Sequence, residues 1–180
     1  MYDLPFHGNK FVEGWELSGI LSVTSGFPFS VTTGSFDVAG VGNPNVYQRV
    51  NIVPGCTAKS ATLGTKTKWF NPACFSLPLV GTFGDQGRNS FTSPGIRDVD
   101  FAILKDTKVP RISETFDVQF RAEAFNLFNH TNLGLPVVGL YSQGPVVNGV
   151  LTGIVNPSAG TFSSTFTPQR TLQFGLKILF

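Results

Sequence analysis

The stretch that decides the fold of this chain is its last one, Thr171-Leu172-Gln173-Phe174-Gly175-Leu176-Lys177-Ile178-Leu179-Phe180. Every even position in it is apolar, whereas four of its five odd positions are Thr, Gln, Gly or Lys. Because successive side chains of a strand point to opposite faces, the pattern predicts a strand with one apolar and one mostly polar face. Its length matches the roughly 9–11 residues that a tilted strand needs to cross a bilayer. We therefore expect a membrane-spanning β-strand here.

The composition favours a protein whose surface meets lipid. Only 13% of the 180 residues are charged, against roughly 25% in an average soluble domain, and Phe occurs 18 times. Few charges and many aromatic residues fit apolar strand faces with aromatic girdles at the membrane interfaces. The net charge of +2 is too small to indicate nucleic-acid binding. No apolar run approaches the ~18 residues of a membrane-spanning helix.

Other stretches show the same alternation. Residues 14–24 and 98–106 alternate, and residues 116–124 do so most clearly, with Asp117, Gln119, Arg121 and Glu123 on one face. Charges of both signs on one face suit a watery lumen better than a dry core, because an unpaired buried charge is costly. Residues 30–33 are expected to extend the first strand beyond an interruption at Pro28, and residues 133–141 to form a weaker strand. The chain would then hold about six strands, with the end of a seventh at residues 1–5.

Two long irregular stretches separate these strands. Residues 34–80 lose the periodicity, and a Gly/Ser/Thr-rich stretch covers residues 142–166. Such loops are unusual in a compact soluble domain but ordinary outside an outer-membrane barrel. The first stretch contains Cys56 and Cys74, and an exported loop lies in an oxidising compartment, so we predict a disulfide between them. A zinc site would need more ligands than two Cys and two distant His provide.

The residues predict no enzyme, metal site or cofactor. Asp98, Asp100 and Asp106 share a strand face, as the carboxylates of an acid–base site do, but a lumen-facing polar stripe explains them more simply. Gly84 and Gly87 lack the preceding apolar strand and the following helix of a phosphate-binding loop. No Ser, His, Cys and carboxylate residues have the arrangement that nucleophilic catalysis requires.

Taken together, these segments resemble the C-terminal part of the barrel of TonB-dependent outer-membrane receptors, specifically the Oar-like group. The similar motifs, which follow the family's order over nearly the whole chain, are Gly14-Trp15-Glu16-Leu17-Ser18-Gly19 with Ser25-Gly26-Phe27-Pro28-Phe29, Trp69-Phe70-Asn71-Pro72-Ala73-Cys74-Phe75, Gly87-Arg88-Asn89 with Pro94-Gly95, Phe120-Arg121-Ala122-Glu123-Ala124-Phe125-Asn126-Leu127-Phe128-Asn129, and the terminal strand. The terminal strand is also similar to the C-terminal assembly signal of outer-membrane barrels. The recognised positions would be Gln173, Gly175, Ile178 and Phe180.

The resemblance implies an all-β fold, an antiparallel transmembrane barrel of about 22 strands around an N-terminal plug. Such a receptor imports large or scarce nutrients with energy relayed by TonB. Residues 1–180 would be the C-terminal part of that barrel, with six to seven strands, no plug and no signal peptide. Because so few strands cannot close around a lumen, we expect the fragment alone not to transport anything.

The resemblance also implies partners and an orientation in the bacterial outer membrane. The partners are membrane lipid, the barrel-assembly machinery through the terminal strand, and TonB only through the missing plug. The last strand of such a barrel runs toward the periplasm. Because a strand at 133–141 would lie between the last strand and the strand at 116–126, the strand at 116–126 would run toward the periplasm as well. Residues 127–131 would then form a periplasmic turn, and the loops at 34–80 and 142–166 would be extracellular.

Two other functions stay open. The first is a passive porin or adhesin-type barrel, which would have no plug upstream. The second is a soluble β-sandwich that binds carbohydrate through its aromatic residues. Dependence on detergent would separate the sandwich from the membrane proteins, and the coding DNA upstream of Met1 would separate the transporter from the porin.

Overall fold

The computed structural model describes residues 1–35, 37–43 and 47–180. The chain divides into two compact units. The strand unit consists of Met1–Thr24, Ile96–Asn132 and Thr167–Phe180, and the loop unit consists of Ser25–Gly95 and Leu133–Phe166.

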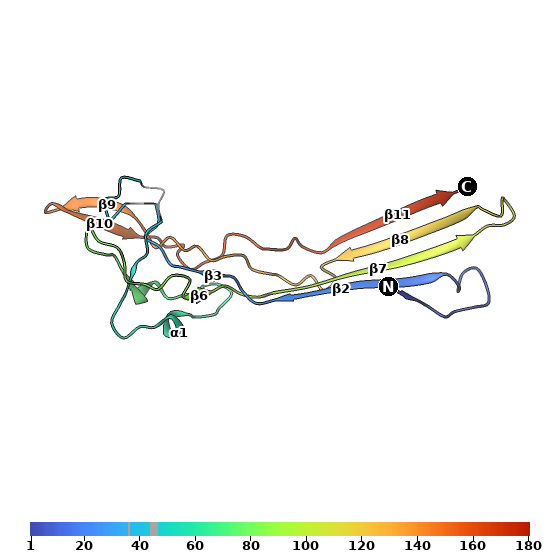
Figure 1. Cartoon of the computed structure of the whole chain (residues 1–180), viewed down its shortest axis with the longest axis horizontal. Helices are drawn as coiled ribbons and strands as arrows, with labels where there is room; N and C mark the ends of the chain where they lie inside the picture. Colours follow the sequence, from blue (N-terminus) through green and yellow to red (C-terminus); the bar gives the residue numbers. More distant parts are fainter. Residues whose placement is uncertain (36, 44–46) are drawn as a thin grey trace. The chain divides into compact units, whose positions relative to one another are not determined.

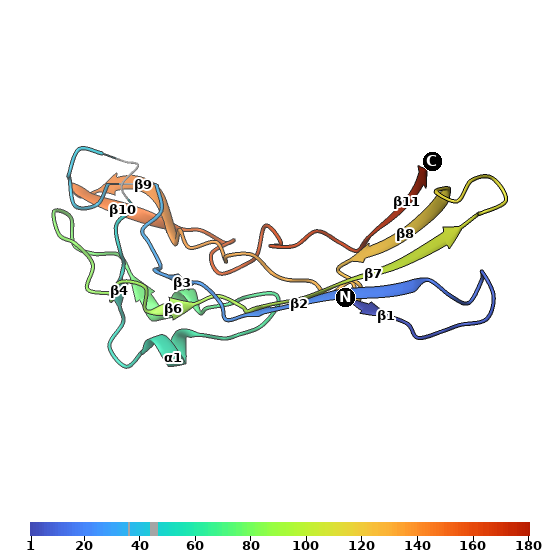
Figure 2. The same ribbon diagram turned by 45° about the vertical axis from the view of Figure 1, so that its right-hand side comes forward.

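The strand unit is one antiparallel sheet of five strands in the order β1-β2-β7-β8-β11. Figures 1 and 2 show the long strands side by side, with the short β1 next to the start of β2 in Figure 2. The strands are β1 (Tyr2–Asp3), β2 (Trp15–Thr24), β7 (Ile96–Lys108), β8 (Asp117–Phe125) and β11 (Thr171–Leu179). Each long strand coincides with a stretch in which apolar and polar residues alternate. Four long strands of 9 to 13 residues therefore match the length that a membrane-crossing strand needs.

The pairing of β8 with β11 corrects the predicted topology. The two strands are direct antiparallel neighbours, with Gln119 opposite Lys177, so they cannot both run toward the same side of a membrane. Residues 127–131 therefore do not form a turn on the side where β11 ends. The predicted strand at 133–141 is wrong, because residues 133–140 make only isolated bridges in the described structure, such as Leu133 with Thr165, and β9 begins at Tyr141. A proline at position 136 has no N–H to give to a strand ladder.

Two other strand predictions had different outcomes. The predicted strand at residues 1–5 is present as β1, Tyr2–Asp3. The predicted extension of the first strand to residues 30–33 is wrong, because β2 ends at Thr24. Val31 is fully buried in the loop unit instead, and Thr32 bridges to Arg49. The described sheet thus holds fewer strands than the six or seven that we expected, and it is not closed into a barrel.

The loop unit contains short paired segments rather than the irregular loops that the sequence suggested. Its sheets pair β3 with β6, β4 with β5, and β9 with β10. Its elements are β3 (Pro28–Phe29), β4 (Asn51–Ile52), α1 (Ala58–Ala61), η1 (Pro72–Cys74), β5 (Phe75–Ser76), β6 (Phe91–Thr92), β9 (Tyr141–Val147) and β10 (Val150–Val155). The β9–β10 hairpin turns at Asn148 and Gly149, which both have positive φ, as two-residue hairpin turns of this sequence require.

The hydrophobic core of the chain lies in the loop unit. Phe70 is fully buried, and its ring meets the ring of Phe75 edge-on at a centroid distance of 5.6 Å. Phe91 lies 5.6 Å from Phe75 and 5.7 Å from Phe29. These four phenylalanines of Ser25–Gly95 share one core with Leu140 and Ala159 of Leu133–Phe166, which explains why the two connections fold together.

Candidate functional site

One face of the sheet is apolar across all four long strands. Because residues that pair across neighbouring strands point to the same face, the register decides which side chains share a surface. The apolar face carries Leu17, Leu21 and Val23 of β2, Val99, Phe101 and Ile103 of β7, Val118, Phe120, Ala122 and Ala124 of β8, and Leu172, Phe174, Leu176 and Ile178 of β11. This set reproduces the apolar positions that the alternation predicts.

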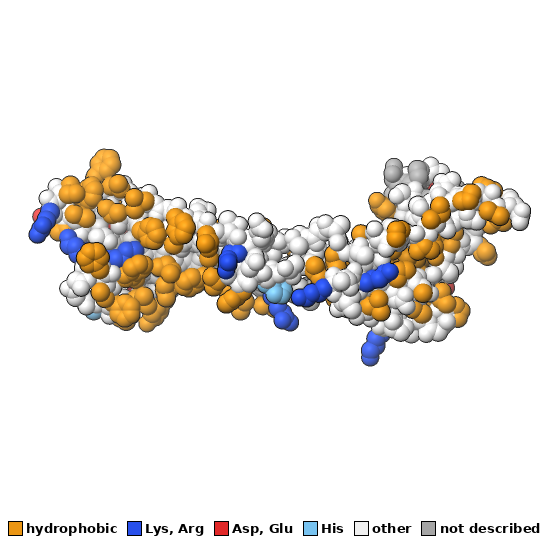
Figure 3. Space-filling view, turned by 180° about the vertical axis from the view of Figure 1, so that it is seen from behind, with side chains coloured by type: hydrophobic (Ala, Val, Ile, Leu, Met, Phe, Trp, Pro, Cys, Tyr) orange, Lys and Arg blue, Asp and Glu red, His pale blue; other side chains and the backbone are white. Residues whose placement is uncertain are grey.

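The apolar face is largely exposed. Leu21 is 71% exposed, Phe174 68% and Leu176 67%, whereas Phe70 and Phe91 of the loop unit are almost completely buried. The same chain thus buries aromatic side chains in one unit and leaves apolar ones uncovered in the other. Figure 3 shows hydrophobic side chains crowding the surface of the strand unit. A continuous exposed apolar surface of this kind needs a membrane or a partner to cover it.

The opposite face of the sheet is mainly polar. Its residues include Glu16, Ser18 and Ser22 of β2, Asp98, Asp100 and Asp106 of β7, Asp117, Gln119, Arg121 and Glu123 of β8, and Gln173, Gly175 and Lys177 of β11. Arg121 forms an ion pair with Glu123, and Gln119 Nε2 donates to Asp106 Oδ1 at 2.8 Å. One carboxylate oxygen each of Glu16 and Asp117 is buried without a hydrogen-bond partner among the described residues.

A tryptophan and a lysine mark one end of the apolar face. Trp15 pairs with Lys105 across β2 and β7, and the Lys105 ammonium lies 5.8 Å from the centroid of the indole ring. Lys105 Nζ donates to the backbone oxygens of Glu13 at 2.6 Å and Asp106 at 2.8 Å. The lysine thus keeps its alkyl chain on the apolar face while its charge reaches polar groups at the strand end.

Two buried asparagines, whose role the sequence did not reveal, brace the opposite end of the sheet. Asn132 accepts a hydrogen bond from Arg97 N at 2.8 Å and donates to Arg97 O and to Thr167 Oγ1, both at 2.9 Å. Asn126 donates to Pro168 O at 3.0 Å and has a positive φ of 51°. These bonds hold the chain that leads into β11 beside the start of β7. The sequence showed only an Asn-rich turn, because the partners lie 35 or more residues away.

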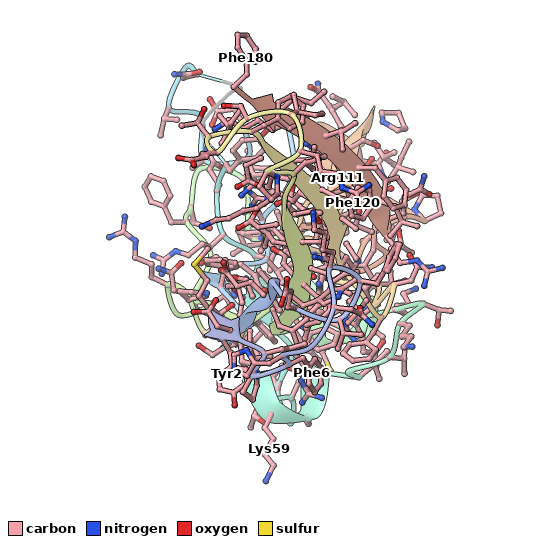
Figure 4. The ribbon with its side chains drawn as sticks, turned by 90° about the vertical axis from the view of Figure 1, so that its right-hand side faces the viewer. Tyr2, Phe6, Lys59, Arg111, Phe120 and Phe180 are labelled. Carbon is pink, nitrogen blue, oxygen red and sulfur yellow. A yellow bond between two sulfur atoms is a disulfide. The ribbon has the colours of Figure 1, made fainter. Side chains whose placement is uncertain are left out.

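The predicted assembly-signal residues lie on both faces of β11. Gln173 and Gly175 are on the polar face and Ile178 is on the apolar face, while Phe180 follows the strand and is 95% exposed. Figure 4 shows the Phe180 side chain pointing away from the sheet. In the described part of the chain, β11 pairs only with β8, so its second edge has no strand partner. The four residues therefore form no single pocket but belong to one open strand edge.

A disulfide joins Cys56 and Cys74, the pair for which the loop composition predicts a bond. Their Cα atoms lie 5.6 Å apart. Cys74 is buried and belongs to the aromatic core, whereas Cys56 packs against the edge of that core. The bond therefore ties the segment that contains α1 to the phenylalanine cluster.

Two groups of the loop unit have shifted pKa values. Desolvation alone would raise the pKa of Asp37, but hydrogen bonds from Val41 N, Gly42 N and the Gln48 side chain outweigh it and lower that pKa. Burial raises the pKa of Tyr141, whose hydroxyl donates to Phe75 O.

Within residues 1–35, 37–43 and 47–180, no group of three or more His, Cys, Asp or Glu is placed to hold a metal ion. No helix in that part of the chain is long and apolar enough to span a membrane.

Comparison with known proteins agrees with the two-faced sheet. Residues 1–173 match a family model described as outer membrane beta barrel domain. No curated protein and no solved structure matches the chain significantly. The match covers nearly the whole chain and includes the four long strands up to the start of β11. The chain therefore belongs to the outer membrane beta barrel domain family, whose place is the bacterial outer membrane.

Proposed function

We propose that this chain is the C-terminal part of the barrel of a TonB-dependent outer-membrane transporter of the Oar-like group, which takes up a large or scarce substrate. The loop unit is the observation that carries the proposal. Ser25–Gly95 and Leu133–Phe166, which connect neighbouring strands of the sheet, fold together around one aromatic core. Long extracellular loops occur in outer-membrane barrels in general. Loops that fold together around one core supply, in addition, the ordered surface that a transporter needs to capture a rare substrate.

The directions of the strands support an orientation in the membrane. β2 and β8 run toward the end of the sheet at which the chain leaves for the loop unit, and β7 and β11 run away from that end. At the other end, residues 4–14 and 109–116 form short turns. Short turns of outer-membrane barrels face the periplasm and long loops face outside. The loop unit is accordingly extracellular, and β11 ends on the periplasmic side.

The two faces of the sheet then have different neighbours. The apolar face meets lipid, and the face with Arg121, Glu123 and Lys177 lines a wet lumen. Both β11 and most of β2 have an edge without a strand partner among the described residues, so further strands are needed to close a barrel. We propose a complete barrel of about 22 strands. In it the chain has a structural and substrate-binding role without catalysis, and TonB acts through a plug encoded upstream.

The proposal is tested on the complete protein that carries this chain, purified from outer membranes. We expect the coding DNA upstream of Met1 to encode, in frame, a signal peptide, a plug and a TonB-contacting segment. We also expect the purified protein to bind the periplasmic domain of TonB and to show no steady conductance in planar bilayers, because the plug blocks the lumen. An open channel without TonB binding would assign the chain to a passive porin instead. A protein that stays monodisperse without detergent would contradict both.

A further inference from the structure

An uncharged cleft opens within the loop unit. It has a volume of about 650 Å³, which lies in the range of roughly 300–1,000 Å³ that is typical of sites for small ligands. Figures 1 and 2 show two of the stretches that form it, the segment before β4 and the β9–β10 hairpin, next to each other. The cleft is lined by residues 34, 35 and 47, by residues 136–139, 141 and 142, and by residues 154–157. None of these described residues is charged.

The backbone packs closely around the cleft. Gly34 has a φ of 82°, and a Cβ added to it would clash with Tyr141 O. A Cβ added to Gly139 would lie 3.3 Å from Gly34 Cα. Gly139 also bridges to Thr32, and its carbonyl oxygen accepts a hydrogen bond from Asn156 Nδ2 at 3.0 Å. Because these contacts hold the cleft walls in place without a ligand, binding requires little ordering of the protein.

The unpaired side-chain polar groups in the cleft are hydroxyls. Those of Ser35, Tyr47 and Ser142 have no hydrogen-bond partner among the residues that the structure describes. The Asn156 amide differs, because both its nitrogen and its oxygen already bond to backbone groups of the loop unit. A hydroxyl both donates and accepts. The cleft therefore suits a ligand with groups that do the same, and it offers no counter-ion to a charged ligand.

A sugar ring combines the properties that these residues require. Tyr47 is 66% exposed, so its ring has room for a stacking partner, and the C–H face of a sugar is apolar. The sugar hydroxyls can exchange hydrogen bonds with Ser35 and Ser142. A peptide fits less well, because the Thr32 bridge and the Asn156 bond leave Gly139 without a free strand edge for it. An apolar ligand would cover the serine hydroxyls without bonding to them.

We propose that this cleft binds a neutral oligosaccharide, with one sugar ring stacked on Tyr47 and its hydroxyls bonded to Ser35 and Ser142. The inference names the substrate class of the proposed transporter, and it rests on the extracellular position of the loop unit in that proposal. Binding itself needs neither TonB nor transport, so the two proposals can fail separately.

The test uses the complete outer-membrane protein in a detergent without a sugar headgroup, applied to an array of neutral and acidic oligosaccharides. We expect neutral oligosaccharides to be retained in preference to acidic ones. Calorimetric titration with the neutral oligosaccharide that is retained most then gives a Kd. Tyr47→Ala should raise this Kd by roughly tenfold, because it removes the stacking surface. Ser35→Ala/Ser142→Ala should raise it by a similar factor, because it removes two hydrogen bonds.

A matched control separates the cleft from the rest of the surface. Tyr2→Ala removes a tyrosine that is 63% exposed and lies in the strand unit, so the Kd should not change. Protease resistance of the loop unit should be the same in all variants, because the three cleft side chains are exposed. Retention of acidic oligosaccharides or of no oligosaccharide, or an unaltered Kd in Tyr47→Ala, would overturn the proposal.

The same purified protein distinguishes this inference from the transporter proposal. A protein that binds the periplasmic domain of TonB but retains no neutral oligosaccharide would refute the inference and leave the transporter standing. A protein that retains neutral oligosaccharides through Tyr47 but forms an open channel without TonB binding would refute the transporter and leave the binding site standing.

Discussion

Phe120 of β8 and Phe174 of β11 stack on the apolar face, with ring centroids 6.4 Å apart and ring planes at 19°. They are diagonal neighbours, because Phe120 pairs with Leu176 and Phe174 pairs with Ala122. Both rings are more than one third exposed, so their outer sides have no protein contact. In a membrane this pair fixes the register of the last two strands and covers their backbone toward lipid.

The facing of β11 gives a direct test of membrane insertion. Leu176 lies near the middle of the strand on the apolar face, and the next residue, Lys177, pairs with Gln119 on the polar face. Leu176→Arg should lower the free energy of unfolding by roughly 2–4 kcal/mol, because it places a charge in the hydrocarbon layer. Lys177→Gln should be close to neutral. The free energies of unfolding of the complete barrel, refolded in lipid vesicles, provide the measurement, and equal losses at both positions would contradict the membrane-facing assignment.

The sequence predicted the strands far better than it predicted how they meet. Alternation along 116–124 and 171–180 is a local signal, and it identified the face of Phe120 and the face of Lys177 correctly. The direct pairing of β8 with β11 depends on residues more than forty positions apart, and no local pattern encodes it. A weak run of apolar residues at 133–141 therefore seemed to be a strand between them, and the predicted direction of β8 was wrong as a consequence.

The hydrophobic core of the loop unit could not be predicted from the sequence for a similar reason. Phe29, Phe75 and Phe91 lie on strands of only two residues, and Phe70 makes only an isolated bridge, with Thr62. Two residues show no periodicity, so the stretch looked irregular. The large number of aromatic residues was the one available signal. We assigned these residues to girdles at the membrane interfaces, although four of the phenylalanines pack a hydrophobic core.

The close approach of another backbone segment explains why position 84 is a glycine, and Gly87, which has no such neighbour, serves as its control. A Cβ at Gly84 would lie 2.2 Å from Arg49 O and 2.4 Å from Val50 O, whereas one at Gly87 would meet only Ser90 Cβ at 3.6 Å. Gly84→Ala should therefore destabilise the loop unit by about 1–3 kcal/mol, because backbone atoms must shift to make room. Gly87→Ala should have little effect. Limited proteolysis of intact cells that express the complete protein measures this difference, and equal protease resistance of the two variants would argue against the close approach.

The Cys56–Cys74 bond should form in protein taken from the outer membrane. The two residues are 18 positions apart, and closing a loop of this size contributes ~3 kcal/mol in the chain-entropy model. Mass spectrometry of peptides prepared without reductant should find the cross-linked pair. Cys56→Ala should increase proteolysis of the loop unit as much as the double variant Cys56→Ala/Cys74→Ala does, because either change removes the same bond. Two free thiols in the native protein would refute the prediction.

Contacts within the described chain explain neither Gly175 nor Phe180, which bears on whether a partner recognises β11 during assembly. A Cβ at Gly175 would meet only Arg121 Cβ, at an ordinary 3.9 Å, so no described neighbour requires glycine at this position. Phe180 is 95% exposed, so its ring packs little against the described chain. If both residues matter, the requirement comes from a partner that approaches the open edge of the strand. We propose that this partner is the barrel-assembly machinery.

Deleting Phe180 from the complete protein should therefore sharply lower its level in the outer membrane of cells, while spontaneous refolding in detergent is much less affected. Phe174→Ala serves as the contrasting control, because it removes the stacking partner of Phe120 and should weaken refolding itself by about 0.5–1.5 kcal/mol. Quantitative immunoblots of outer-membrane fractions and refolding yields in detergent separate recognition from packing. An unchanged cellular level after the deletion would show that Phe180 is only an interfacial side chain, and the assembly role would then have to lie in the backbone edge of β11 alone.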